Sequence, residues 1–140
     1  MEIDINWLAI TLAALSTLVI GSIWYAPKAF GGQWRQMTHP GKKKESSEGA
    51  LGAILVALAV SFVTAYTLAH FAFLANQYFG NSFLHDSLAT AFWAWLGFTA
   101  ARLVTHDAFE GRRQRLTLIN IGHELVVFMT MGLIIGLLAP

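Results

Sequence analysis

The stretch "ALGAILVALAVSFVTAYTLAHFAFL", residues 50–74, contains no Asp, Glu, Lys or Arg. A helix of about 20 apolar residues is long enough to cross the ~30 Å hydrocarbon core of a bilayer. The stretch shows none of the apolar–polar alternation that marks a half-buried strand. Because lipid offers the backbone no hydrogen-bond partner, this stretch is predicted to be a transmembrane helix.

The whole chain has the composition of a membrane protein. Hydrophobic residues make up 56% of it and charged residues 12%, whereas soluble domains carry about 25% charge. A length of 140 residues leaves room for one compact unit, so residues 1–140 are predicted to form a single membrane domain. The absence of cysteine excludes disulfides, thiolate metal sites and cysteine nucleophiles.

Three more stretches match the first in length and hydropathy. They are residues 5–26, 86–105 and 116–138. We therefore expect an all-α fold, a polytopic bundle of four transmembrane helices.

The basic residues predict the orientation of this bundle. All nine Lys and Arg residues fall in or beside the connections at residues 27–49 and 106–115, and the connection at residues 75–85 has none. The positive-inside rule then makes the two basic loops cytoplasmic and gives an N-out/C-out topology. A cleaved signal peptide is the competing interpretation of residues 5–26, but it requires a basic start and an apolar run of only about 7–15 residues.

The stretch "WYAPKAFGGQW", residues 24–34, follows the first span. Trp and Tyr rings favour the headgroup level of a bilayer, and a proline can end one helix and open another. Apolar side chains at helical spacing then favour a short interfacial helix on the cytoplasmic leaflet, despite two glycines. The alternative is a solvated loop whose aromatic side chains pack under the bundle. The predicted interface residues are Trp24, Tyr25, Pro27, Phe30 and Trp34.

Four motifs together resemble a known family. They are "NWLA" at residues 6–9, "WYAPKAFGGQW", "FEGR" at residues 109–112 and "LINIGHELVVFMTMGLIIG" at residues 118–136. Over nearly the whole chain they are similar to small bacterial membrane proteins known as domain of unknown function 1761. The resemblance implies four transmembrane helices in the bacterial cytoplasmic (inner) membrane and brings no established activity. The family pattern has Gly-Tyr-His-Leu at the positions of Gly122 to Leu125, so this chain departs at His123 and Glu124.

Glu124 is an acid within the last apolar stretch. It lies eight residues beyond Leu116, or ~12 Å at 1.5 Å per residue, a little short of the bilayer midplane. The same depth in the other helices falls near three hydroxyl side chains. Asn120 precedes Glu124 by one helical turn, and Arg102 can snorkel outward or lean inward as its partner. The predicted polar cluster comprises Glu124, Asn120, His123, Arg102, Thr17, Ser61 and Thr99.

Two interpretations of this cluster remain open. In the structural one, Glu124 and Arg102 form a buried pair that orients the last two helices. In the functional one, Glu124 is a proton or cation station in a permeation path, the default hypothesis for an intramembrane acid. The sequence favours the pair, because one acid and one nearby arginine can neutralise each other. A proton relay would need a second acid at membrane depth, and the sequence offers none.

Gly132 and Gly136 form a small-xxx-small pair, which lets two helices approach closely. Their partner is either another helix of the same chain or a second subunit. The sequence leaves both interpretations open.

The histidines near the outer surface are candidate metal ligands. His70, His85 and Asp86 are predicted at similar depth and could together hold Zn²⁺ or Cu²⁺. Interfacial histidines that only hydrogen-bond water are far commoner, so we expect no metal and no cofactor.

The sequence lacks the motifs of soluble enzymes. It has no phosphate-binding glycine loop, no zinc-protease helix motif and no serine elbow. Its basic residues serve topology, so nucleic-acid binding is not expected. We expect no enzyme but a structural or accessory protein of the lipid bilayer, a homo-oligomer or a subunit of a larger membrane complex. The alternative is a small oligomeric transporter or channel that uses Glu124.

Overall fold

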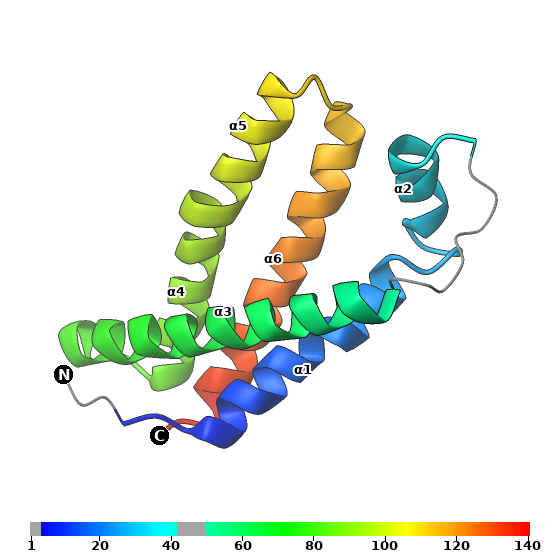
Figure 1. Cartoon of the computed structure of the whole chain (residues 1–140). Coiled ribbons are helices and arrows are strands. Elements are labelled where there is room, and N and C mark those ends of the chain that lie inside the picture. The colour runs from blue at the N-terminus through cyan, green and yellow to red at the C-terminus, as the bar shows by residue number, and fades with distance from the viewer. Residues whose placement is uncertain (1–3, 42–49) are drawn as a thin grey trace.

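The structure is a computed structural model that describes residues 4–41 and 50–140. Within these ranges all regular elements are helices, which confirms the all-α prediction. In chain order they are α1 (Trp7–Trp24), α2 (Gly31–Thr38), α3 (Ala50–Phe79), α4 (Phe83–Ala94), the π-helix η1 (Trp95–Ala100), α5 (Ala101–Phe109) and α6 (Gln114–Leu137) (Figure 1). Residues 42–49, which include three lysines of the first predicted basic loop, lie outside the described residues.

Among the described residues, three helices are long and apolar enough to cross a membrane. They are α1, α3 from Leu51 to Phe79, and α6. They correspond to three of the four stretches predicted as spans, and they indicate a membrane protein. The fourth predicted span, residues 86–105, falls on α4, η1 and α5, which follow one another without a break but are each shorter than ~20 residues.

The π-helix η1 separates α4 from α5. Its last bond runs from the Ala101 N–H to the Leu96 carbonyl, five residues back rather than four. A π-turn contains one residue more than an α-turn. Every residue after η1 is therefore one position out of step with a uniform α-helix.

The first and last helices are joined at one end of the molecule. The Asn6 side chain caps α1 by accepting a hydrogen bond from the Ala9 N–H, with an N–O distance of 3.1 Å. Its amide nitrogen also donates to the Leu138 carbonyl at the end of α6, at 2.9 Å. In Figure 1 α6 runs beside α4, η1 and α5, while α1 and α3 lie next to each other and cross α4 and α6 near this end.

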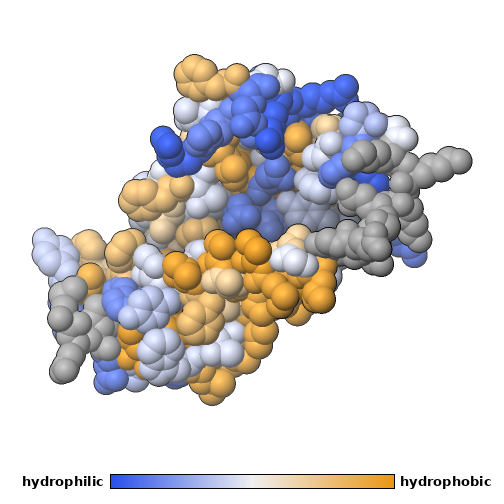
Figure 2. Space-filling model, viewed as in Figure 1, coloured by the Kyte–Doolittle hydropathy of each residue, from blue (hydrophilic) through white to orange (hydrophobic). Residues whose placement is uncertain are grey.

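The core is built largely from small side chains. Ile10 and Met131 are its largest fully buried apolar residues. The buried alanines around them include Ala13, Ala14, Ala65, Ala72 and Ala91. Small residues allow close helix approach, which is the usual packing of membrane helices. Large apolar side chains instead point outward and form a hydrophobic band over α3 (Figure 2), a surface suited to lipid.

Gly132 and Gly136 pack against α4 of the same chain. A Cβ atom at Gly132 would lie 2.7 Å from the Ala91 Cβ, and one at Gly136 would lie 2.8 Å from the Leu84 Cα. Ser87 is fully buried between these contacts. Of the two interpretations of this glycine pair, the geometry therefore favours packing inside the chain.

Candidate functional site

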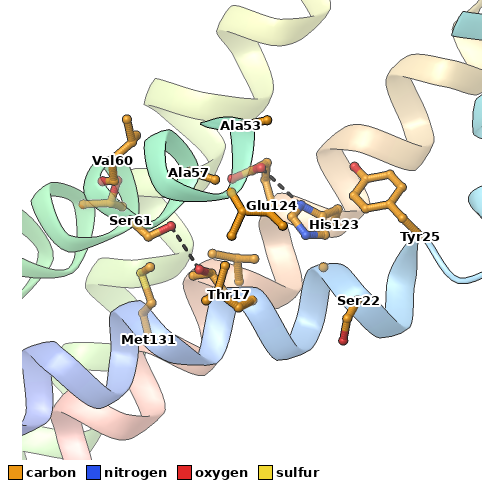
Figure 3. Close-up of a pocket in the computed structure, with 15 residues that line it drawn as sticks. Thr17, Ser22, Tyr25, Ala53, Ala57, Val60, Ser61, His123, Glu124 and Met131 are labelled. Atoms are coloured by element: carbon orange, nitrogen blue, oxygen red, sulfur yellow. Dashed lines mark hydrogen bonds and ion pairs between the residues drawn. The ribbon is translucent and has the colours of Figure 1, made fainter. Parts of the chain in front are cut away.

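A cavity of about 760 Å³ lies between α1, α3 and α6. Most of its lining is apolar, and its polar groups come from all three helices and from Tyr25 just after α1. Four members of the predicted polar cluster meet here (Figure 3): Thr17, Ser61, His123 and Glu124. The cavity therefore gathers polar groups from distant parts of the chain around one carboxylate.

Glu124 has one polar partner in this cavity. Its Oε1 lies 3.2 Å from the Nδ1 of His123, and its side chain is 34% exposed. Within residues 4–41 and 50–140, Glu124 forms no other hydrogen bond or ion pair. Its second carboxylate oxygen is therefore available to whatever enters the cavity.

His123 is held between two aromatic rings. Its ring centroid lies 6.1 Å from that of Trp24 and 5.0 Å from that of Tyr25. With Nδ1 directed at Glu124, Nε2 is buried and has no hydrogen-bond partner among the described residues. Gly21 lies beside this nitrogen, since a Cβ atom there would be 3.8 Å from it. If Nδ1 donates to Glu124, Nε2 carries a free lone pair.

Two tryptophans fix the α6 backbone just before Glu124. The Trp24 indole donates to the Ile119 carbonyl at 3.2 Å, and the Trp95 indole donates to the Ile121 carbonyl at 3.0 Å. Gly122 makes room for the first of these rings, because a Cβ there would lie 3.3 Å from Trp24 Cζ2. The sequence did not identify Trp95 as a site residue, although an indole within an apolar helix needs a partner for its N–H.

Four of the five predicted interface residues form an aromatic cluster at the C-terminal end of α1. Trp24 contacts Phe30 at a centroid distance of 4.6 Å, and Tyr25 contacts Trp34 at 5.4 Å. The Tyr25 hydroxyl donates to Asn120 Oδ1 at 3.3 Å, which links this segment to α6. Pro27 lies exposed in the turn between α1 and α2. The predicted short helix is α2, so the alternative of a solvated loop is wrong for residues 31–38. The aromatic packing that this alternative included does occur.

The expected pair between Glu124 and Arg102 is not formed. Arg102 is exposed on α5 and makes no ion pair within residues 4–41 and 50–140. Thr99 is half-buried in η1 and does not line the cavity. Both residues lie in or after the π-helix, whose extra residue in the turn changes the face that neighbouring side chains occupy. A shared depth alone therefore did not bring them to the cavity. Two other members of the predicted cluster do meet, since Thr17 Oγ1 lies 3.0 Å from Ser61 Oγ.

The candidate metal ligands are only partly brought together. His85 Nδ1 lies 3.3 Å from Asp86 Oδ1, whereas His70 Nδ1 lies 2.9 Å from the Tyr66 carbonyl of its own helix. No group of three or more His, Asp or Glu side chains suited to a metal occurs in the described part of the chain.

Asp86 instead closes the connection between α3 and α4. It is 3% exposed, and its two oxygens accept hydrogen bonds from Asn81 at 2.9 Å and Asn76 at 2.8 Å. The sequence signal for this cluster was two asparagines and an aspartate around a short connection. Asp107 stabilises the connection between α5 and α6 in a similar way, because it accepts a 2.7 Å hydrogen bond from Thr117.

Residues 8–136 match the family described as protein of unknown function (DUF1761). The chain belongs to this family. The prediction made from four sequence motifs is therefore confirmed. Comparison with curated proteins and with solved structures gave no match. The fold gives a physical reason for two of the motifs to occur together, since "WYAPKAFGGQW" packs on α6 through Trp24 and Tyr25 at Ile119, Asn120 and His123.

Proposed function

We propose that the protein crosses a bacterial cytoplasmic membrane four times, with both ends outside. Three helices long enough to span, and the unbroken helical run from α4 to α5, support four crossings. The Lys and Arg residues of the described chain lie in or beside the turns after α1 and after α5, which supports a cytoplasmic position for these turns. On this topology α2 lies at the cytoplasmic surface.

We further propose that the protein is a small transporter or channel in which Glu124 is the proton or cation station. One observation carries this proposal: Glu124 faces a cavity and has His123 as its sole polar partner among the described residues. The structural interpretation needed Arg102 as its partner, and Arg102 is exposed elsewhere. An acid in apolar surroundings without a Lys or Arg partner binds a proton or a cation, because its bare charge is costly there.

The residues around Glu124 suit such a station. His123 accompanies the carboxylate and has a second ring nitrogen that can hold a proton. The Trp24 and Trp95 indoles hold the α6 backbone, so the acid keeps its position as its charge changes. Charge on Glu124 can therefore alternate without rearranging the helices that support it.

Proton flux into liposomes tests this function. Purified protein is reconstituted in vesicles that contain the pH dye pyranine, and a pH gradient is imposed with valinomycin and potassium to prevent a counter-potential. The wild type should dissipate the gradient and Glu124→Gln should not. The matched control is Asp4→Asn, which removes an exposed acid that does not line the cavity. A wild type no faster than empty vesicles would overturn the transport proposal.

An accessory role is the second candidate, in which a neighbouring membrane protein or a second subunit fills the cavity. The observation that favours it is the exposure of cavity residues on α3, such as Ala57 and Val60. A photo-crosslinking residue at position 57 should then give one discrete protein adduct in native membranes. The same group at Ala59, which is exposed but does not line the cavity, should give no such adduct. Equal labelling from both positions would count against a specific partner.

A further inference from the structure

The size of the cavity restricts what Glu124 can bind. A volume of about 760 Å³ far exceeds the space that a proton or a bare metal ion needs. It falls within the ~300–1,000 Å³ typical of sites for small organic molecules. The cavity is therefore large enough for a small organic molecule.

The side chains that line the cavity restrict the polarity of the ligand. Leu18 on α1, Ile54 on α3 and Met131 on α6 contribute apolar surface from three sides. The hydroxyls of Thr17 and Thr64 are bonded to carbonyls of their own helices, at 2.8 and 3.0 Å. Few polar groups of the cavity remain to bind a hydrophilic ligand, so most of the ligand must be hydrocarbon.

The charge of the ligand follows from Glu124. Among the described residues that line the cavity there is one carboxylate and no Asp, Lys or Arg side chain, and the remaining titratable groups are His123 and Tyr25. A single carboxylate in apolar surroundings matches a single positive charge. The Tyr25 ring adds a face to which an organic cation is attracted.

A metal ion matches this cavity poorly. Ca²⁺ requires about 6–8 oxygen ligands, and Mg²⁺ requires a near-ideal octahedral set. The described residues contain no group of three or more metal-binding side chains. A zwitterionic lipid headgroup also fits poorly, because its phosphate would bring a second negative charge close to Glu124.

We propose that the cavity between α1, α3 and α6 binds a lipophilic organic cation with one positive charge, whose charged group pairs with Glu124. This inference rests on the proposed transport function and names the substrate class of the same site. The cation and a proton compete for one carboxylate, so the release of each follows from the binding of the other.

Tetraphenylphosphonium, a monovalent cation with an apolar shell, is a suitable probe. Its binding to purified protein in a nonionic detergent is measured with radiolabelled ligand and a scintillation proximity readout. Saturable binding is expected, and Glu124→Gln should weaken it at least tenfold. Triphenylphosphine oxide, which is similar in shape but neutral, and tetramethylammonium, which is charged but small, should compete poorly.

A second pair of variants keeps the test valid if Glu124→Gln does not fold. Ala57→Phe fills the cavity from α3 and leaves Glu124 in place, whereas Ala59→Phe makes the same change outside the cavity. Ala57→Phe should weaken tetraphenylphosphonium binding at least tenfold, and Ala59→Phe should not. Gel filtration and a thermal melt check that each variant is folded.

The outcomes separate this inference from the proposed function. Proton flux that depends on Glu124, without tetraphenylphosphonium binding, overturns the substrate class and leaves the transport function intact. Binding that Glu124→Gln or Ala57→Phe leaves unchanged also overturns the inference, because the probe then sits elsewhere. Binding lost in both variants, without proton flux in the wild type, supports the site and overturns transport.

Discussion

The backbone oxygen of Tyr25 occupies the space that any side chain at Gly31 would need. The Gly31 N–H donates to the Ala26 carbonyl at 3.1 Å, so the turn after α1 brings two backbone segments into contact at this point. The aromatic cluster of Trp24, Phe30 and Trp34 depends on this turn. Glycine is thus required here by close approach and not by an unusual backbone angle.

Gly31→Ala is expected to destabilise the protein by about 1–3 kcal/mol or more, because the new methyl group meets backbone that cannot rotate away. Gly32→Ala is the matched control, since its Cβ would lie 3.7 Å from the Pro27 carbonyl oxygen, an ordinary contact. Thermal melts in detergent measure both changes. Equal melting temperatures for the two variants would contradict the contact.

The packing of α6 on α4 gives a second prediction. Gly132→Ala and Gly136→Ala should each cost about 1–3 kcal/mol, because the added methyl overlaps Ala91 or Leu84. Gly97→Ala in η1 is the control, since nothing lies within 4 Å of its Cβ position. Light scattering should find the mass in detergent unchanged in all three. A loss of mass in the glycine variants, with the subunit still folded, would instead indicate a subunit interface.

Glu124 and Arg102 should behave as independent sites. The free energies of unfolding lost in Glu124→Gln and in Arg102→Gln are expected to add in the double mutant to within about 0.5 kcal/mol, as they do for residues that share no partner. Melts of the wild type, both single mutants and the double mutant test this. Substantial recovery of stability in the double mutant would show that the two side chains pair after all.

The topology can be tested with single cysteines, since the native chain has none. Ser82→Cys, in the connection before α4, should react with an impermeant thiol reagent in intact cells. Gln114→Cys, at the start of α6, should be protected until the membrane is permeabilised. Both positions are exposed, so the membrane and not burial determines their access. The reverse pattern would invert the proposed orientation.

Hydropathy predicted the helices well, because the need to satisfy the backbone in lipid leaves an apolar stretch little alternative. It also indicated which residues share a depth, as Thr17 and Ser61 do at 3.0 Å. The faces of the third predicted span were harder to predict. Nothing in "WLGFTA", residues 95–100, indicates a π-helix, and the sequence left open whether Arg102 snorkels outward or leans inward.

The hydrogen bonds from side chains to the backbone of α6 could not be predicted from the sequence either. Trp24 and Trp95 are ordinary apolar residues by hydropathy, and their N–H groups could have pointed to water, headgroups or backbone. Both reach carbonyls of α6 on either side of Asn120. Which carbonyl an indole meets depends on the distance and angle between helices, and a single sequence does not encode these in any local pattern.

The π-helix also determines how the chain turns from α5 into α6. A helix advances by ~100° for each residue, so a chain with one residue fewer in η1 would present α5 rotated by that angle. The Asp107 carboxylate, buried against Thr117, would then point away from α6 and lose its 2.7 Å hydrogen bond. The π-helix η1 thus determines the rotation of α5 about its axis, and the direction of the Asp107 side chain two turns later depends on that rotation. Apart from Trp95, which binds α6, chains of this kind should accept a change in the composition of η1 far more readily than a change in its length.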